Sequence, residues 1–381
     1  MNKKRTKNRI NRYKKILVVG LIIMNCFSMT SCFSYKDVNK LLFITAIIID
    51  VDNYGNAVIY AEAFKGLRGS SPQGMDERIL FNGIGKTMFE AFRNMNATSS
   101  YKLNYTQNKA IIFTQRAAEL GLDNFIDMLD RDQELLIRPY ISVYMGDPQK
   151  LIKLKIAQDK YIGLFVVQLI ENIGSSSRAV KLSLNEFYNQ RKIGDKANVI
   201  TIIDISKDNL EPKLQVNGGA VIKDDKMVGV LAKEEGQGYN FLMNTILGGT
   251  LEITNPCDIN KFVTLEIRKS KTKTEISYYD NIIHLKRKIK VKVDFGEAQK
   301  SIDLTKENIK KIQDKSAENI VEACNSVFNK YKGMGIDIFD IAEEFYRKYP
   351  NIKIDDIIDK TELKIEAEVE IMNIGDVNNF Q

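Results

Sequence analysis

The cysteine at position 32 has surroundings that point to a definite chemistry, the attachment of lipid to its thiol. Eight basic side chains and no acidic one lie in residues 1–15, and an apolar run follows over residues 16–24. The three residues directly before Cys32 are Met, Thr and Ser. This order is typical of a secretory leader whose cleavage exposes a lipid-accepting cysteine. We therefore predict a signal peptide over residues 1–31 and a Cys32 that carries fatty acyl groups such as palmitate.

An uncleaved membrane anchor is the alternative interpretation of the same segment. The apolar run is roughly half of the ~20 residues that a membrane-spanning helix needs, which favours a leader. Cys26 is a poorer lipid acceptor than Cys32, because the bulkier polar Asn25 precedes it. In both interpretations the remainder of the chain lies outside the cytoplasm and is tethered to a bilayer.

The other two cysteines, Cys257 and Cys324, do not form a disulfide framework. One bond between them is formally possible, so their pairing stays open. Cys324 lies in a helical pattern of apolar residues that forms one stripe between Ile309 and Tyr331. This pattern favours a buried thiol that packs as a small apolar group.

The chain has one histidine, His284, which is poorly placed for catalysis. On its predicted strand it shares the face of four lysines, at positions 286, 288, 290 and 292, and no carboxylate is evidently directed at it. A Ser-His-Asp triad needs a serine and a carboxylate directed at the histidine, and a multi-histidine metal site needs further histidines. Neighbouring acids such as Asp355 and Asp356 diverge in space and do not indicate acid–base catalysis. We expect no catalytic residues, no metal site and no cofactor.

A Gly-Lys-Thr sequence at residues 85–87 is similar to the end of a phosphate-binding loop. It follows a predicted strand and precedes a predicted helix. Leu80 stands where the first glycine of that loop should be, and Met88 stands where a dinucleotide fingerprint needs a glycine. Without those glycines the backbone cannot wrap a phosphate. Thr87 as the N-cap of the helix is the better interpretation.

The lysine face at positions 286–292 is most simply a solvated face. Contact with anionic lipid headgroups is the alternative, since the lipid would hold the protein near them.

The charge and the length of the chain limit its possible partners and its number of domains. The chain has 56 basic and 49 acidic residues, and loss of the eight basic residues at its start leaves 48 against 49. The pI of about 8.9 therefore reflects the leader, and overall basicity does not support nucleic-acid binding. About 350 residues would remain after cleavage, which suggests two or three domains.

The first predicted region, residues 32–205, mixes strands and helices after a short polar tether over 32–40. Predicted strands cover 41–51, 57–64, 78–84, 109–113 and 138–144; predicted helices cover 87–94, 116–129, a segment opened by Asp147 and Pro148, and 157–192 with a break at 174–177. The apolar stretch at 161–170 is too short for a membrane span and is predicted to be a buried helix, with an exposed partner-binding face as the alternative. Alternation of this kind predicts a mixed sheet with helices packed on it.

The second predicted region, residues 213–381, follows a linker at about 206–211. It opens with a hairpin over 214–222 and 227–231. Predicted strands then cover 250–254, 260–268, 274–279 and 282–294, followed by helices over 306–331 and 336–348 and a strand with one wet face over 363–371. The overall prediction is an α+β protein of two or three mixed α/β domains, with mostly antiparallel sheets, packed helices and an N-terminal lipid tether.

These pieces, in this order, resemble the Ger(x)C family, the lipoprotein C subunits of spore germinant receptors. The resemblance starts at Cys32 and covers nearly the whole mature chain. Its sharpest parts are the segments GIGKTMFEAFR at 83–93, GGAVIKDDKMVGVL at 218–231, DIFDIA at 337–342 and YRKYP at 346–350. Members commonly carry tryptophans after the lipid cysteine and after the Tyr-Pro pair; this chain has Phe33 and residues 351–354 there and no tryptophan at all.

The resemblance implies a non-enzymatic subunit on the outer face of the spore's inner membrane. It would assemble with integral membrane A- and B-type receptor subunits, and nutrient binding by the complex would trigger ion release and germination. No nucleic acid is implied as a partner, and the nutrient need not touch this subunit. A solute-binding lipoprotein that captures a small molecule by itself is the alternative; it would need a cleft with converging polar groups.

Overall fold

The computed structural model describes residues 18, 20, 40–65, 78–132, 134–172, 176–206, 211–300, 302–373 and 379–380. Cys32 and nearly all of the predicted signal peptide and tether lie outside the described residues. The chain divides into two compact units, Met1–Leu41 and Leu42–Gln381. The fold described below is that of the second unit.

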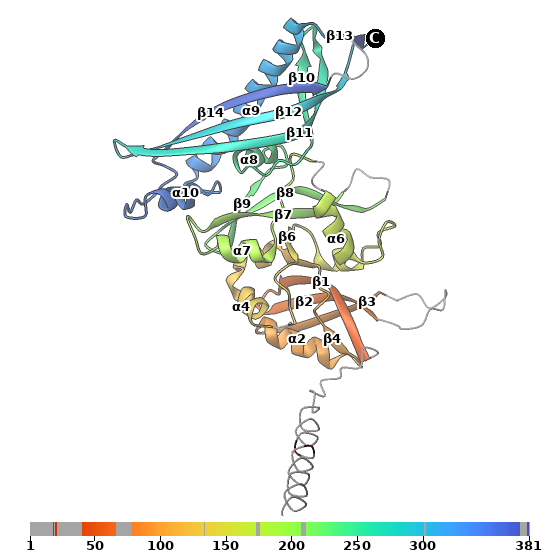
Figure 1. The fold of residues 1–381 in the computed structure, drawn as a ribbon. Helices are drawn as coiled ribbons and strands as arrows, with labels where there is room; N and C mark the ends of the chain where they lie inside the picture. The colour runs from red at the N-terminus through yellow and green to blue at the C-terminus, as the bar shows by residue number, and fades with distance from the viewer. Residues whose placement is uncertain are drawn as a thin grey trace, which may run out of the picture. The chain divides into compact units, whose positions relative to one another are not determined.

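A nine-stranded mixed sheet forms the first part of this unit (Figure 1). Its strands follow the order β3-β2-β1-β5-β6-β7-β8-β9, and β4 pairs with β1. The bounds are β1 Leu41–Val51, β2 Ala57–Lys65, β3 Ile79–Gly85, β4 Lys102–Asn104, β5 Ala110–Thr114, β6 Tyr140–Tyr144, β7 Ala197–Ser206, β8 Lys213–Lys223 and β9 Lys226–Leu231. The four central strands β1, β5, β6 and β7 are parallel, and the flanking pairs are antiparallel.

Helices cover both faces of this sheet, because its central strands are apolar on both sides. On one face, Ile47, Ile111 and Ile141 pack against α2, α3, α4 and α7. On the other, Ile48, Ile112 and Ile203 pack against α5 and α6. The helix bounds are α2 Met88–Ala97, α3 Gln115–Leu120, α4 Asp123–Arg131, α5 Pro148–Lys153, α6 Ile162–Glu171 and α7 Leu184–Gln190.

A four-stranded sheet forms the second part, in the order β10-β11-β12-β14. Its bounds are β10 Thr250–Asn255, β11 Asp258–Tyr279, β12 Ile282–Ala298 and β14 Thr361–Asn373. Strands β11 and β12 form one long antiparallel hairpin, and β14 joins β12 in parallel. Figure 1 shows these long strands lying together, with α9 crossing them.

One face of this second sheet carries the core that it shares with its helices. Leu285, Ile289 and Val291 point into a cluster with Ile320, Cys324 and other residues of α9. The remaining elements are α8 Gly236–Leu242, α9 Lys306–Gly333, α10 Ile341–Lys348 and a small pair, β13 Ile302–Asp303 with β15 Asn379–Phe380. None of the helices in the described part of the chain is long and apolar enough to cross a bilayer.

The predicted mixed α+β fold is confirmed, and several local predictions hold. Thr87 accepts a hydrogen bond from the backbone N–H of Glu90, and Asp147 accepts one from Gln149, so both are N-caps. The apolar stretch at 161–170 is α6, with five buried residues on the sheet. Strands β1, β2 and β14 and the hairpin β8–β9 also lie where they were predicted.

Other local predictions are wrong, each for a physical reason. The predicted helix over 116–129 is two helices, because Gly121 adopts φ +134° between them. The predicted strands 260–268 and 274–279 are one continuous strand, β11, because it pairs with β12 along its length. Residues 336–340 precede α10 instead of belonging to it, since Asp340 adopts a left-handed φ of 57°. Strand β7 and helix α8 were not predicted.

The nine-stranded sheet continues across the predicted linker. Strand β8 pairs with β7 from Ala197–Lys223 to Ser206–Lys213, so the hairpin β8–β9 completes the sheet built by the first region. The predicted division into domains 32–205 and 213–381 therefore does not coincide with a break in the sheet, and the number of independently folding domains stays a prediction.

Candidate functional site

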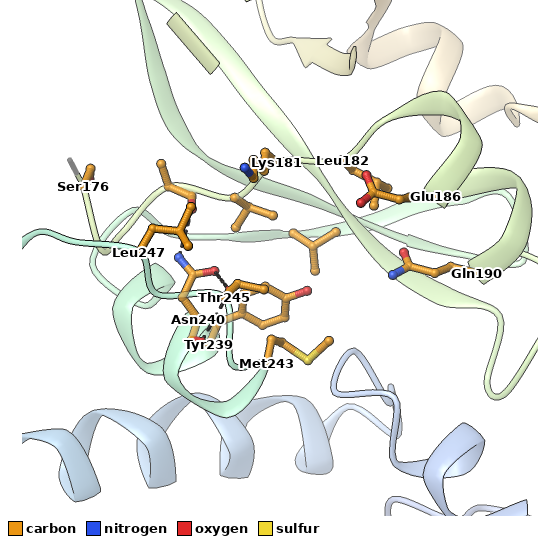
Figure 2. A pocket seen from close by; sticks show the side chains of 13 residues that line it. Ser176, Lys181, Leu182, Glu186, Gln190, Tyr239, Asn240, Met243, Thr245 and Leu247 are labelled. Carbon is orange, nitrogen blue, oxygen red and sulfur yellow. Dashed lines mark hydrogen bonds between the residues drawn. The ribbon is translucent and has the colours of Figure 1, made fainter. Parts of the chain in front are cut away.

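A cavity lies where α7 and α8 approach β7 (Figure 2). Its volume is about 160 Å³. The apolar part of its wall comes from Val180, Leu182, Val199 and Met243, and Lys181, Glu186 and Gln190 lie around it. The volume is below the ~300–1,000 Å³ that is usual for ligand pockets, so the space fits only a small molecule or a few waters.

Two glycines allow α8 to form one wall of this cavity. A Cβ built on Gly236 would lie 1.9 Å from the carbonyl oxygen of Arg178, and one on Gly238 would lie 2.4 Å from that of Ala323. Any side chain at either position would therefore push α8 away from the 176–183 segment or from α9. The Gly-Gln-Gly sequence is thus a packing feature that holds a small helix between two larger elements.

The most buried polar side chain of the cavity, Asn240, is already fully hydrogen-bonded within the protein. Its Nδ2 donates to the carbonyl oxygens of Ser177 and Ala179, both at 2.9 Å, and its Oδ1 accepts from Thr245 Oγ1 at 2.9 Å (Figure 2). Glu186 is similarly occupied, because it accepts hydrogen bonds from the backbone N–H and the hydroxyl of Ser183. These groups fix local structure and leave few donors or acceptors for a ligand.

The hydroxyl of Tyr239 is the exception. Figure 2 shows it pointing along the cavity toward the side on which Gln190 lies. Burial raises the pKa of Tyr239, so the hydroxyl stays protonated and can donate a hydrogen bond.

A cluster of buried and half-buried charged groups ties the two sheets together near Tyr239. The carboxylate of Asp195 pairs with Lys223 of β8 and accepts a hydrogen bond from the backbone N–H of Asp337 at 2.9 Å. Asp337 in turn accepts from the backbone N–H groups of Phe339 and Ala342, at 3.0 and 2.7 Å. Its carboxylate therefore fixes the turn that leads from α9 into α10.

Arg287 binds this turn from the second sheet. Its side chain is 5% exposed, and its Nη1 lies 3.0 Å from Glu344 Oε1 on α10. Its Nη2 donates to the carbonyl oxygen of Phe339 at 3.3 Å. Burial and the nearby Asp337, Glu343 and Glu344 raise the pKa of Asp340 to about 7. This cluster of charged groups serves to hold elements together and shows no nucleophile paired with a base.

A second buried carboxylate, Glu62, joins four segments inside the first sheet. Glu62 Oε1 accepts from the backbone N–H of Ile162 at 2.9 Å, and Oε2 accepts from Gly163 at 3.1 Å. Arg78 Nε lies 2.5 Å from Oε1, and Thr45 Oγ1 donates to Oε2 at 2.6 Å. The fully buried carboxylate thus satisfies the free N–H groups at the start of α6.

The segment that is similar to a phosphate loop has a packing role. A Cβ built on Gly83 would lie 2.2 Å from the carbonyl oxygen of Ala91, and one on Gly85 would lie 2.5 Å from the backbone nitrogen of the same residue. The two glycines therefore let α2 lie directly on β3. Lys86 uses its backbone N–H to donate to Glu90, within the start of the helix.

The prediction that no carboxylate faces His284 is wrong. Its Nδ1 lies 3.5 Å from Glu362 Oε2, and its ring stacks on Tyr279 with centroids 3.8 Å apart. The carboxylate comes from β14, which is distant in sequence, so the strand pattern of β12 could not reveal it. His284 does share the half-exposed face of the lysines, as predicted.

The lysine face is not an open basic surface. Lys286, Lys290 and Lys292 pair with Glu366, Glu368 and Glu370 of β14, at 2.5, 2.6 and 3.2 Å. Lys288 pairs with Glu275 of β11 at 2.6 Å. These ion pairs neutralise the lysines and argue against contact with anionic headgroups through this face.

The two remaining cysteines are not bonded to each other. Cys257 is exposed, and Cys324 is buried with its thiol 3.5 Å from the carbonyl oxygen of Gly238. Burial raises the pKa of Cys324 to about 12, which suits a packed, unreactive thiol. Within the part of the chain that the structure describes, no group of three or more His, Cys, Asp or Glu side chains is arranged to hold a metal ion.

The two parts of the chain are each similar to a known protein family. Residues 34–205 match the family model of the spore germination protein N-terminal domain, and residues 217–375 match that of the spore germination B3/GerAC-like C-terminal domain. The chain belongs to the Ger(x)C family of spore germination proteins. The predicted resemblance to this family is confirmed.

Individual Ger(x)C relatives are similar over nearly their whole length. Spore germination protein GerQC of Bacillus cereus is 23% identical over 87% of this chain and 94% of its own. Spore germination protein B3 of Bacillus subtilis (strain 168) is 21% identical over 92% of this chain and 96% of its own. The crystal structure of the GerBC protein aligns with a TM-score of 0.57 and 19% identity, over 86% of this chain and 97% of that one, which shows a shared fold.

Proposed function

We propose that this protein is a non-enzymatic lipoprotein subunit of a nutrient germinant receptor. In this proposal it is anchored through Cys32 to the outer face of the spore's inner membrane and assembles there with integral membrane A- and B-type subunits. The observation that carries the proposal is the match to both Ger(x)C family models, in order, along one chain.

The arrangement of charged groups supports a role in assembly. Glu62, Asp337 and Arg287, which are buried, each bind backbone groups, and Glu62 and Arg287 also pair with Arg78 and Glu344. His284 is held between Tyr279 and Glu362 on a surface strand. Groups used in this way stabilise a scaffold, and they are not arranged as a nucleophile, a general base and an oxyanion site would be.

Gene deletion tests the role in germination. Spores that lack the gene should form normally and fail to germinate with particular nutrients, and a gene copy restored in trans should recover the response. Normal germination of the deletion strain across a broad panel of amino acids, sugars and nucleosides, in a strain without related receptors, would contradict the proposal.

The membrane anchor is tested by substituting the cysteines one at a time. Cys32→Ala should release the protein from spore membranes, because two acyl chains supply stable anchoring at ~0.8 kcal/mol per buried CH₂. Cys26→Ala and Cys257→Ala are matched controls that should leave it membrane-bound. Mass spectrometry of the mature amino terminus should find acyl groups on Cys32; an unmodified terminal peptide would refute the lipid anchor.

Co-purification tests the partners. The lipidated protein, solubilised from spore membranes with mild detergent, should be recovered with two polytopic membrane proteins. Its recovery as a free monomer under conditions that keep other receptors intact would count against the assembly.

The cavity beside Tyr239 favours one alternative, a solute-binding lipoprotein. Thermal-shift measurements with amino acids and sugars would reveal such a ligand as a concentration-dependent rise in Tm. A rise that Tyr239→Phe abolishes would assign the ligand to this cavity, and no rise with any compound would leave the receptor subunit as the better description.

A further inference from the structure

Strand β14 presents a long edge with no neighbouring strand among the residues that the structure describes. It has 13 residues, from Thr361 to Asn373, and pairs only with β12. Half of the backbone N–H and C=O groups of such a strand point away from its single neighbour and can accept a further strand.

The other sheet edges in the described part of the chain are shorter or blocked. Residues 267–279 of β11 extend beyond β10, but Asn244 accepts a hydrogen bond from the backbone N–H of Thr272 there, and Lys348 donates one to the carbonyl oxygen of Ile276. Strands β3 and β10 have seven and six residues. Strand β9 also has six, and the side chains of Lys330 and Tyr331 on α9 donate to the carbonyl oxygen of Val230 within it. The edge of β14 is therefore the one best suited to extended pairing.

Strand β14 also lacks most of the usual features that protect an edge. It contains no proline, its register with β12 is regular from Thr361 to Ile371, and its inward residues from Leu363 to Ile371 are all apolar. Leu363, Ile365, Ala367 and Ile371 are only partly buried at the margin of the core. An added strand with apolar residues at alternate positions would cover the exposed part of these side chains.

The outer face of β14 is mainly acidic. It carries Glu362, Glu366, Glu368 and Glu370 with a single Lys364. Glu368 and Glu370 remain 67% and 56% exposed although each contacts a lysine of β12. On the next strand inward, β12, the same face carries the lysines that pair with Glu366, Glu368 and Glu370.

This pattern disfavours pairing of the edge with a second copy. An antiparallel pair of β14 strands centred on residue 366 would place Glu366 opposite Glu366 and, twice each, Glu362 opposite Glu370 and Lys364 opposite Glu368. Like-charge contacts would therefore outnumber opposite-charge contacts. Like charges directly opposite each other are destabilising, whereas opposite charges stabilise a strand pair. A strand that carries basic residues on this face would place opposite charges beside the glutamates of β14, as β12 does on its other side.

We infer that the free edge of β14 binds an extended segment of a partner protein in which lysine or arginine alternates with apolar residues. Backbone hydrogen bonds to β14 would supply affinity, and the row of glutamates would select the basic strand. This inference does not depend on the identity of the receptor partners.

The test uses synthetic peptides and the full-length lipidated protein in detergent. The probe is a fluorescently labelled octapeptide of alternating Lys and Val. One comparison peptide has the same sequence with every backbone nitrogen methylated, which keeps the charge and removes the backbone donors. Another alternates Glu and Val. Binding is followed by fluorescence anisotropy, and its location by amide hydrogen exchange.

The Lys-Val peptide should bind at least tenfold more tightly than either comparison peptide and should slow hydrogen exchange in residues 361–373. The double variant Glu368→Gln/Glu370→Gln should weaken its binding several-fold. The matched control Glu266→Gln/Glu275→Gln, on the same face of β11, should leave it unchanged.

Three outcomes would overturn the inference. The first is equal binding of the methylated peptide, which would show attraction of charge alone. The second is protection confined to another strand, or an equal loss of binding in the β11 control. The third is self-association of the protein that Glu368→Lys abolishes, which would show that a second copy occupies the edge.

Discussion

The nine-stranded and four-stranded sheets bury their residues in different ways. The first has helices on both faces, so strands such as β1 are almost entirely buried. The second has helices on one face only, and its other face carries rows of lysine and glutamate. The difference suggests that the first sheet supplies stability and that the second supplies a surface on which recognition can depend.

The largest expected effect comes from breaking the carboxylate network of the first sheet. Glu62→Ala should lower the free energy of unfolding by about 3–5 kcal/mol, because Arg78 and the N–H groups of Ile162 and Gly163 would be buried without their partner. Urea denaturation followed by circular dichroism measures it. Glu252→Ala is the matched control, since its pair with Arg178 is about two-fifths exposed; a loss of less than about 1 kcal/mol for Glu62→Ala would contradict the assignment.

A steric change in the first sheet should have the next largest effect. In Gly163→Ala the new methyl group would lie 2.2 Å from the carbonyl oxygen of Thr45, so α6 would have to shift on the sheet. We expect a loss of about 1–3 kcal/mol in the same denaturation measurement. Gly333→Ala at the end of α9, where the added carbon meets nothing within 4 Å, should be close to neutral, and equal losses in both variants would refute the packing argument.

The junction between the sheets should respond to pH through Asp340. Its pKa is raised to about 7, so the folded state binds this proton more tightly than the unfolded state does. The resulting stabilisation is present below about pH 4 and is lost as the pH rises toward 7.

Asp340→Asn should therefore raise stability at pH 8 by about 1–3 kcal/mol and have little effect near pH 4. Asparagine also tolerates the left-handed backbone at this position. The control is Asp356→Asn, an exposed residue with a similar φ of 56°. Stability measured across pH 4 to 8 checks the prediction, and an equal gain for both variants would show that the backbone and not the charge is responsible.

The smallest effect is expected on the charged face of the second sheet. Lys290→Ala removes an ion pair whose two side chains are 71% and 67% exposed. Such pairs contribute about 0–1 kcal/mol, so the midpoint of urea denaturation should barely move. A loss comparable to that of Glu62→Ala would mean that the exposed charges of the second sheet stabilise the fold as much as the buried charges of the first.

Local patterns in the sequence predicted much of the fold. The alternation of apolar and charged residues in β14, the Asp-Pro start of α5 and the N-cap Thr87 each depend on neighbours in the chain, and each was predicted correctly. Strand β7 was missed because its apolar residues followed a region interpreted as helical, and parallel pairing with β6 decides its structure.

The buried charges depend on contacts between distant residues. Glu62 stands between buried alanines in β2, and Arg287 stands among inward-facing apolar residues of β12. A charged residue at an apolar position signals a buried partner, and this signal was available in the sequence. The identity of each partner was not, since Ile162 lies 100 residues from Glu62 and Glu344 lies 57 residues from Arg287.

The hairpin β8–β9 has a consequence for how this chain can be divided. A fragment that stops at Ser206 would expose the flank of β7, a strand whose residues 197–203 are all buried. An apolar strand opened in this way is a template for aggregation. Truncated or recombined chains should therefore be divided after Leu231, so that β8 and β9 stay with the sheet that they complete. A division at the boundary between the two family models would separate them from it.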